Sequence, residues 1–159
     1  MQLNRLASVG ARFFLVCSAL TVALSALPAS AADRAIVLKT IADANAGTKT
    51  PVDLGEHGPS QGDVFVFDQP LLNDQRKAIG NNSGFCITVR PGAFSQCQWT
   101  LQLKDGTITV GGQEAASGPS TLPVIGTTGA YQQYNGVLVT KPLPDGTYSQ
   151  IVTLRRIAR

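Results

Sequence analysis

Four polar side chains near the expected ends of strands carry most of the chemistry that this chain could perform. Asp68 and Tyr131 are the candidate catalytic residues, because a carboxyl or a phenol can transfer a proton or stabilise developing charge. Arg90 and Tyr134 are the candidate ligand-binding residues. Each has a structural alternative: a turn cap for Asp68, a hairpin tip for Arg90, packing for Tyr131 and simple exposure for Tyr134.

The residues of several common kinds of active site are missing. His57 is the only histidine, so a zinc site has too few ligands and we expect no metal. A Ser-His-Asp triad would have to use His57, and no Gly-x-Ser-x-Gly sequence accompanies it. The glycine turn at 126–129 is followed by neither a Lys-Ser/Thr pair nor a helix, so it does not bind phosphate as a P-loop does.

The N-terminal residues have the pattern of a secretory signal peptide. Arg5 and Arg12 flank the start of an apolar run over 13–27, and small residues at 29–31 provide a signal peptidase site. The apolar run is shorter than the roughly 20 residues that span a bilayer, so we expect no stable membrane anchor. We therefore predict a signal peptide over 1–31 and a secreted or periplasmic protein.

The expected mature chain, 32–159, suits one domain of 128 residues. We divide it into an N-terminal strand with a long loop over 32–62 and the remainder of the domain over 63–159. Loss of Arg5 and Arg12 lowers the net charge from +3 to +1. Because nucleic-acid binding needs a strongly basic surface, we expect no nucleic-acid partner.

Cys86 and Cys97 remain in the expected mature chain, and an even number of cysteines in an oxidising compartment favours a disulfide. Both lie in stretches with the pattern of strands, joined around 90–93. If this loop is symmetric, Val89 faces Phe94 and Cys86 lies directly opposite Cys97, at a Cα separation that a disulfide can bridge. The alternative is a redox-active pair, but ten intervening residues do not make a Cys-x-x-Cys motif.

Alternation of polar and apolar residues predicts an all-β domain. Strands fit the stretches 64–68, 85–89, 97–103, 107–110, 121–125, 136–140 and 148–154. Residues 36–41 could form another strand or a short helix, and 46–61 is a long connection rich in Gly, Pro and Thr. Turn signals every 8 to 15 residues indicate a sandwich or a barrel.

The stretch 97–103 separates two faces most clearly. Cys97, Trp99 and Leu101 share one face, and Gln96, Gln98, Thr100 and Gln102 share the other. One face is therefore packed, because successive residues of a strand point to opposite sides. The polar face could meet either solvent or a ligand cavity.

Several elements, taken in order, resemble the allene oxide cyclase and dirigent barrel superfamily. Residues 53–63 resemble the loop that leads into a barrel strand in bacterial members. Residues 67–71 resemble the end of the dirigent strand, with its acidic-x-Pro-Leu element, and we expect the strand within 62–72 to stop at Pro70. Residues 80–89 resemble the following strand, and the glycine turn at 126–129, followed by Tyr131 and Gly136, completes the resemblance.

The resemblance implies an eight-stranded antiparallel β-barrel, often trimeric, with an apolar central cavity. Members of the superfamily cyclise reactive intermediates or steer the coupling of phenoxy radicals, and they do so without a cofactor. Holding a reactive molecule near its attack geometry removes much of the entropic barrier. The implied partners are therefore an apolar small molecule and further copies of this chain.

Neither catalytic set of the superfamily is present. Residues 36–43 lack the dirigent His-Asp pair, and 66–69 lack the Glu-containing element of plant allene oxide cyclases. Two functions stay open: a cofactor-free cyclase or stereochemical guide, and a non-catalytic barrel that binds or carries a hydrophobic molecule. The cyclase predicts a cavity with a buried ionisable group. A third, structural function predicts a barrel filled by its own side chains.

Overall fold

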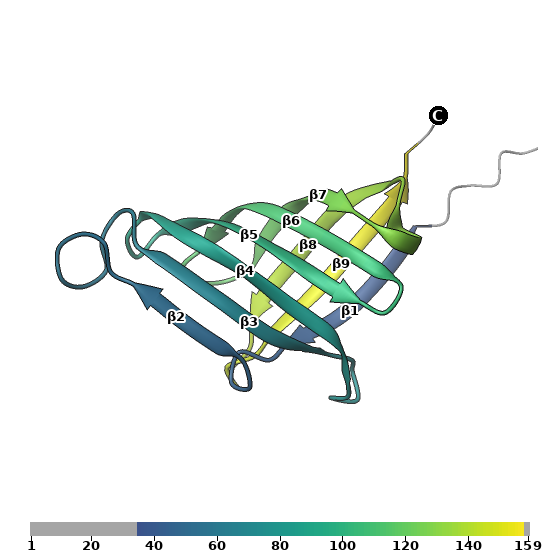
Figure 1. Cartoon of the computed structure of the whole chain (residues 1–159), viewed down its shortest axis with the longest axis horizontal. Coiled ribbons are helices and arrows are strands. Elements are labelled where there is room, and N and C mark those ends of the chain that lie inside the picture. Colours follow the sequence, from purple (N-terminus) through teal and green to yellow (C-terminus); the bar gives the residue numbers. More distant parts are fainter. Residues whose placement is uncertain (1–34, 158–159) are drawn as a thin grey trace, which may run out of the picture. The chain divides into compact units, whose positions relative to one another are not determined.

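The computed structural model describes residues 35–157 and shows an all-β barrel (Figure 1). The predicted signal peptide over 1–31 lies outside the described residues. The elements are β1 (Ile36–Ala42), β2 (Thr48–Val52), β3 (Val64–Leu72), β4 (Ala78–Arg90), β5 (Phe94–Leu103), β6 (Gly106–Ala115), β7 (Ser120–Thr127), the 3-10 helix η1 (Gly129–Tyr131), β8 (Tyr134–Pro142) and β9 (Tyr148–Arg156). None of the described residues forms a helix long and apolar enough to cross a membrane.

Eight antiparallel strands close the barrel, as the resemblance implied. They follow the order β1-β9-β8-β7-β6-β5-β4-β3, and β1 closes the ring by pairing with Leu71 and Leu72 at the end of β3. The ninth strand, β2, pairs with the first part of β3, outside the closed ring. Residues 46–61 are therefore not only a connection, because Thr48–Val52 add a strand at the sheet edge.

Pro70 lies within β3, and the expectation that the strand stops there is wrong. The carbonyl of Pro70 accepts a hydrogen bond from the N–H of Asp43 at 2.9 Å, where the edge of β3 changes its partner from β2 to β1. The nitrogen of Pro70 points to the same side as its carbonyl. Its missing N–H therefore falls where the ladder is already interrupted, which makes proline tolerable inside a strand.

The connection between β2 and β3 is organised by Asp63. Its carboxylate accepts hydrogen bonds from the backbone N–H of Ser60 at 2.6 Å and of Leu54 at 3.1 Å. These bonds lower the pKa of the Asp63 carboxyl, because they favour its charged form. The family-like stretch 53–63 thus has a clear structural role.

The interior of the barrel is apolar over much of its length. Its fully buried side chains are Leu71, Leu101, Ile108, Val110, Leu122, Leu138, Val152 and Leu154. In β5, Trp99 and Leu101 point inward, whereas Gln98 and Gln102 are exposed. The polar face of this strand therefore meets solvent and not a ligand cavity.

Cys86 and Cys97 lie directly opposite each other in β4 and β5 and form the predicted disulfide, with Cα atoms 4.0 Å apart. The register changes after Thr88, so Arg90, and not Val89, lies opposite Phe94. The irregularity brings the Arg90 guanidinium 5.3 Å from the centroid of the Phe94 ring. The prediction of facing cysteines is confirmed, and the predicted symmetric loop is wrong.

We expect removal of the disulfide to lower the free energy of unfolding by up to about 3 kcal/mol, because the cross-link restricts the unfolded chain. Urea denaturation of the Cys86→Ala/Cys97→Ala double variant measures this loss. Reduced wild-type protein is the matched control, since it keeps both sulfur atoms without the bond. Equal stability of the oxidised and reduced proteins would show that the cross-link contributes nothing.

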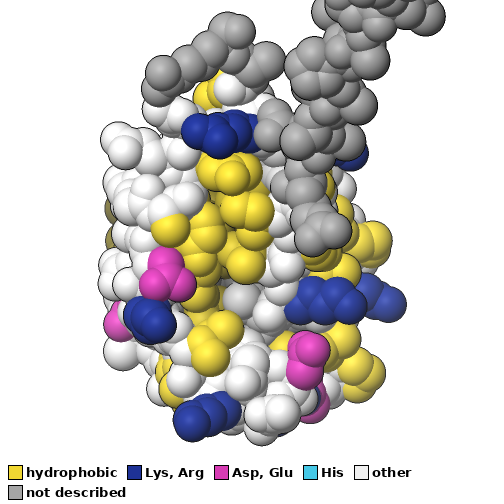
Figure 2. Space-filling view, turned by 90° about the vertical axis from the view of Figure 1, so that its right-hand side faces the viewer, with side chains coloured by type: hydrophobic (Ala, Val, Ile, Leu, Met, Phe, Trp, Pro, Cys, Tyr) yellow, Lys and Arg dark blue, Asp and Glu magenta, His cyan; other side chains and the backbone are white. Residues whose placement is uncertain are grey.

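The outer surface of the barrel carries apolar side chains. Figure 2 shows them gathered in a band on the face seen from the right of Figure 1. On the outside of β8 and β9, Val137, Val139 and Ile151 are exposed, and Val139 lies directly opposite Ile151. Contiguous exposed apolar surface of this kind is typical of association sites.

Candidate ligand cavity

One end of the barrel holds a cavity of about 520 Å³. Three connections border it: the turn after β1, the β6–β7 loop and the β8–β9 hairpin. The side-chain Nδ2 of Asn45 donates to the backbone carbonyl of Asp145 at 2.9 Å, which ties the first of these connections to the third. The described barrel is therefore not completely filled by its own side chains.

Aromatic side chains from neighbouring strands form one wall of the cavity. Phe65 and Phe67 point inward from β3, and their ring centroids are 6.0 Å apart. Trp99 of β5 meets Phe67 edge-on at 6.3 Å between centroids. These rings offer a flat apolar surface to a ligand.

Neutral polar side chains line other parts of the interior at this end. Thr140 of β8 and Gln150 of β9 lie directly opposite each other, and both line the cavity. Gln150 Oε1 accepts a hydrogen bond from Thr40 Oγ1 of β1 at 3.2 Å. On the other side, Gln69 of β3 lies opposite Asn82 of β4. The cavity is thus less apolar than the resemblance implied.

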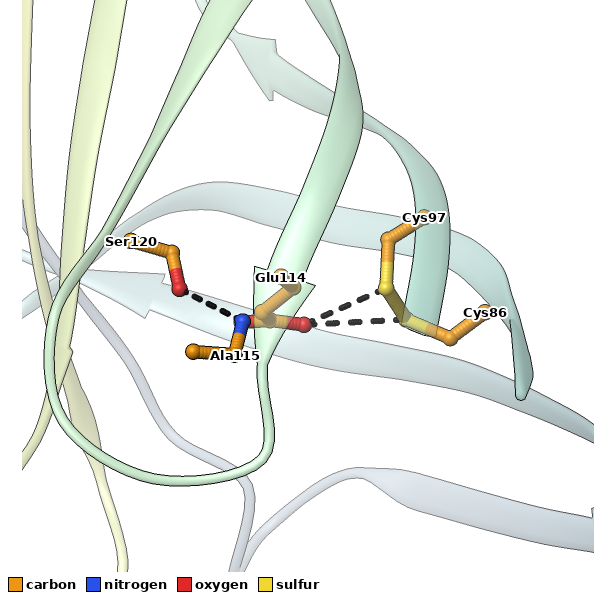
Figure 3. Close-up of a disulfide and its surroundings, with 5 residues drawn as sticks. All are labelled: Cys86, Cys97, Glu114, Ala115 and Ser120. Carbon is orange, nitrogen blue, oxygen red and sulfur yellow. Dashed lines mark hydrogen bonds between the residues drawn. A yellow bond between two sulfur atoms is a disulfide. The ribbon is translucent and has the colours of Figure 1, made fainter. Parts of the chain in front are cut away.

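Among the residues that the structure describes, Glu114 is the only carboxylic residue that lines the cavity. It lies near the end of β6, on the inner face that also carries Ile108 and Val110. Burial raises the pKa of the Glu114 carboxyl above its ordinary value, because water no longer solvates the charged form. The hydroxyl Oγ of Ser120 accepts a hydrogen bond at 2.9 Å from the neighbouring backbone N–H of Ala115, which fixes the end of β6 (Figure 3).

The carboxyl of Glu114 points at the disulfide. Its Oε2 lies 3.3 Å from Cys97 Sγ and 3.6 Å from Cys86 Sγ (Figure 3). A disulfide sulfur carries no hydrogen, so a hydrogen bond exists here only if Glu114 is protonated and donates. The contact and the burial therefore act in the same direction, towards the protonated acid.

Tyr148 adds a phenol to the same cavity. Its pKa is raised, first by burial and second by the negative charge of Glu114. The two groups are thus close enough for their charges to interact. A carboxyl whose pKa is raised is more readily protonated and can give its proton to a bound molecule.

We expect Glu114 to make stability depend on pH. Because its pKa is raised from 4.5 in the folded state, the folded protein binds more protons than the unfolded chain above that pH. The free energy of unfolding should therefore fall as the pH rises from 4.5 through the raised pKa. Melting curves of wild type and Glu114→Gln across this range test the effect: the variant should lack this part of the decline, and parallel curves would contradict it.

The sequence-predicted residues Asp68, Arg90, Tyr131 and Tyr134 do not line this cavity. Asp68 is exposed on the outer face of β3, where it accepts a hydrogen bond from Asn81 Nδ2. Arg90 is exposed at the end of β4. Their catalytic and binding roles stay predictions, and the structure does not bring the four residues together.

The two tyrosines lie on other parts of the barrel. Tyr131 is buried in η1, and the backbone of η1 is bonded to the β5–β6 hairpin, at the end of β6 opposite to Glu114. Its pKa is raised, mainly by burial and secondly by the charge of Asp105. Tyr134 begins β8 and packs, partly buried, against the apolar core.

Sequence reasoning missed Glu114 and Tyr148. The strand expected over 107–110 continues to Ala115, through Gly111 and Gly112. Along β6, Glu114 lies on the same side of the strand as Ile108 and Val110, and along β9 Tyr148 lies on the same side as Val152 and Leu154. A charged or phenolic residue in register with a buried apolar face was the available signal.

The two cysteines and Glu114 also form a candidate set of ligands for a metal ion. The two Sγ atoms of the disulfide and the Glu114 carboxylate lie within 4.8 Å of one another. The sulfurs are bonded to each other and so offer no thiolate, which is the form of cysteine that binds metals. In this oxidised state the cluster is better described as a carboxyl beside a disulfide.

Comparison with known proteins agrees with this architecture. Residues 39–153 match the model of the allene oxide cyclase barrel-like domain family. A search of curated protein sequences finds no match.

Several solved structures share the fold. A pyocyanin demethylase superposes with a TM-score of 0.65 and 23% identity, over 75% of this chain and 99% of the demethylase. The Diels-Alderase AbmU from Streptomyces koyangensis superposes with a TM-score of 0.64 and 17% identity, over 77% of this chain and 64% of the Diels-Alderase. The pterocarpan synthase dirigent protein PsPTS1 superposes with a TM-score of 0.63 and 16% identity, over 80% of this chain and 98% of the dirigent protein.

Proposed function

We propose, from the premise that this chain belongs to the family of allene oxide cyclase barrel-like domains, that it cyclises a reactive small molecule or steers its stereochemistry without a cofactor. The molecule would bind in the cavity at the mouth of the barrel. The observation that carries the proposal is Glu114, a partly buried carboxyl with a raised pKa in the wall of that cavity. Similar barrels named for a demethylase, a Diels-Alderase and a pterocarpan synthase support it.

The cavity would act by confinement. Phe65, Phe67 and Trp99 hold the apolar body of the substrate, and the surrounding strands restrict its conformations. A molecule held close to its reacting geometry has already lost much of the entropy that opposes ring closure. This contribution requires no charged group.

Proton transfer would be the second contribution. The protonated Glu114 carboxyl can donate to a substrate oxygen on which negative charge develops. Tyr148 lines the same cavity, and its hydroxyl would donate a hydrogen bond to the same oxygen. We propose that this chemistry takes place outside the cytoplasm, in line with the signal-peptide pattern and the disulfide.

A binding or carrier barrel is the second candidate. It is favoured by the absence of both catalytic residue sets of the superfamily, at 36–43 and at 66–69. In that function the same cavity would hold a hydrophobic molecule, and Glu114 would only bind its polar end. No product would form.

Incubation with small-molecule extract from the host distinguishes the two functions. Protein and solution are separated afterwards, and both fractions are analysed by untargeted chiral mass spectrometry against a heat-denatured control. A new or stereochemically enriched product in solution supports the enzyme. A compound retained unchanged on the protein supports the carrier. If neither fraction changes, the proposed function is wrong.

A further inference from the structure

Two buried polar atoms beside the cavity have no hydrogen-bond partner among the described residues. They are the side-chain oxygen Oδ1 of Asn82 and the indole nitrogen Nε1 of Trp99. Both side chains line the cavity and are almost fully buried, at 2% and 3% exposure. Because buried polar groups nearly always have a partner, each unpaired group in a protein calls for a physical reason.

The two side chains are neighbours on the inner face of the barrel. Trp99 of β5 lies opposite Gly84 of β4, two residues from Asn82, so the two are diagonal neighbours across adjacent strands. Gln69 lies directly opposite Asn82 on the other side and also lines the cavity. An amide both donates and accepts hydrogen bonds, and an indole N–H only donates. One patch of wall, formed by Gln69, Asn82 and Trp99, therefore combines donors and an acceptor.

This patch is electrically neutral. Among the described residues that line the cavity, only Glu114, Lys49 and Tyr148 are titratable; Lys49 is exposed, and the pKa of Tyr148 is raised from 10, so its phenol stays neutral. The raised pKa of the Glu114 carboxyl favours its neutral form, so this group offers hydrogen bonds and no charge to a ligand. The polar end of the ligand is therefore recognised by neutral hydrogen bonds.

We propose that the ligand is a neutral, planar molecule whose polar edge places a hydrogen-bond donor beside an acceptor, as in a lactam or a cyclic imide. This ligand class rests on the proposed function and deepens it. The donor of the ligand pairs with Asn82 Oδ1, its acceptor pairs with the N–H of Trp99, and its ring packs against Phe65 and Phe67. Both protein atoms lie beneath the cavity surface, so binding shifts the side chains that cover them.

Trp99 is the only tryptophan of the chain, so quenching of its fluorescence reports occupation of the cavity directly. Three probes of similar shape separate the hydrogen bonds from the apolar contacts. 2-Quinolone has a lactam N–H beside a carbonyl, 1-methyl-2-quinolone lacks the donor, and naphthalene lacks both groups. We expect 2-quinolone to bind at least about tenfold more tightly than either of the others, because only it satisfies both buried atoms. Equal affinities, or no saturable quenching by 2-quinolone, would overturn the proposal.

The Asn82→Leu variant removes the amide and keeps a side chain of similar size. It should bind 2-quinolone and 1-methyl-2-quinolone with affinities within about threefold of one another, because the donor of 2-quinolone has lost its partner. Asn135→Leu, the same change on the exposed face of β8, is the matched control and should keep the preference. A competing account lets Asn82 and Trp99 pair with each other after a small adjustment. It predicts that Asn82→Leu leaves the preference unchanged, and that result would also overturn the proposal.

The extract experiment separates failure of the ligand class from failure of the proposed function. If host compounds are converted or retained while 2-quinolone has no advantage, the function stands and the ligand class is wrong. If 2-quinolone shows the preference while no host compound is converted or retained, the ligand class stands and the function is wrong.

Discussion

The Glu114→Gln variant should form product at least about 100-fold more slowly than wild type, and it should still bind the substrate. The amide has nearly the shape of the acid and keeps hydrogen-bonding atoms at the same place, but it cannot give up a proton to the substrate. The loss should therefore fall on kcat with little change in KM. Product formation measured by chiral mass spectrometry at several substrate concentrations gives both values.

Glu56→Gln is the matched control for this prediction. Glu56 is the other glutamate of the chain and lies exposed in the loop between β2 and β3, away from the cavity lining. The same change there should leave the rate unaltered. A Glu114→Gln rate within a few-fold of wild type would show that the barrel works by confinement alone. A wild-type protein that retains a compound and forms no product would identify the carrier instead.

The Leu101→Ala variant should lose about 2 to 5 kcal/mol in the free energy of unfolding. Leu101 is completely buried in the middle of the interior. Truncation removes apolar contacts and leaves a void that the closed ring of strands cannot collapse to fill. Urea denaturation measures the loss.

Gln102→Ala is the matched control for Leu101→Ala. Gln102 follows Leu101 in β5 and points to solvent, so its truncation should cost less than about 0.5 kcal/mol. A small effect of Leu101→Ala would indicate a loosely packed interior that adapts to lost volume. Similar losses in both variants would show that the strand, and not the core side chain, determines stability.

Local patterns predicted the all-β class and the disulfide, and the family resemblance implied the eight-stranded barrel. The alternation in 97–103 separates inner from outer side chains without knowledge of the rest of the chain, and facing strands joined by a short turn place Cys86 opposite Cys97. The bulge after Thr88 was not predicted, since it depends on the conformation of the turn itself.

The site could not be predicted in the same way. In β3 both faces are apolar, with Phe65 and Phe67 on one and Val64 and Val66 on the other. Alternation therefore does not show whether Asp68 points into the barrel or to solvent. The closure of the ring decides this, and closure pairs residues that are far apart in the chain. Ring closure also determines that Glu114 of β6 and Tyr148 of β9 line the same cavity.

The most direct test of the account is a crystal structure of the protein carrying the compound that it retains or converts from host extract. We expect electron density for that compound inside the cavity, in contact with Trp99 and within hydrogen-bonding distance of Glu114. Density only on the outer surface, or a cavity closed by the protein's own side chains, would contradict a function based on this cavity.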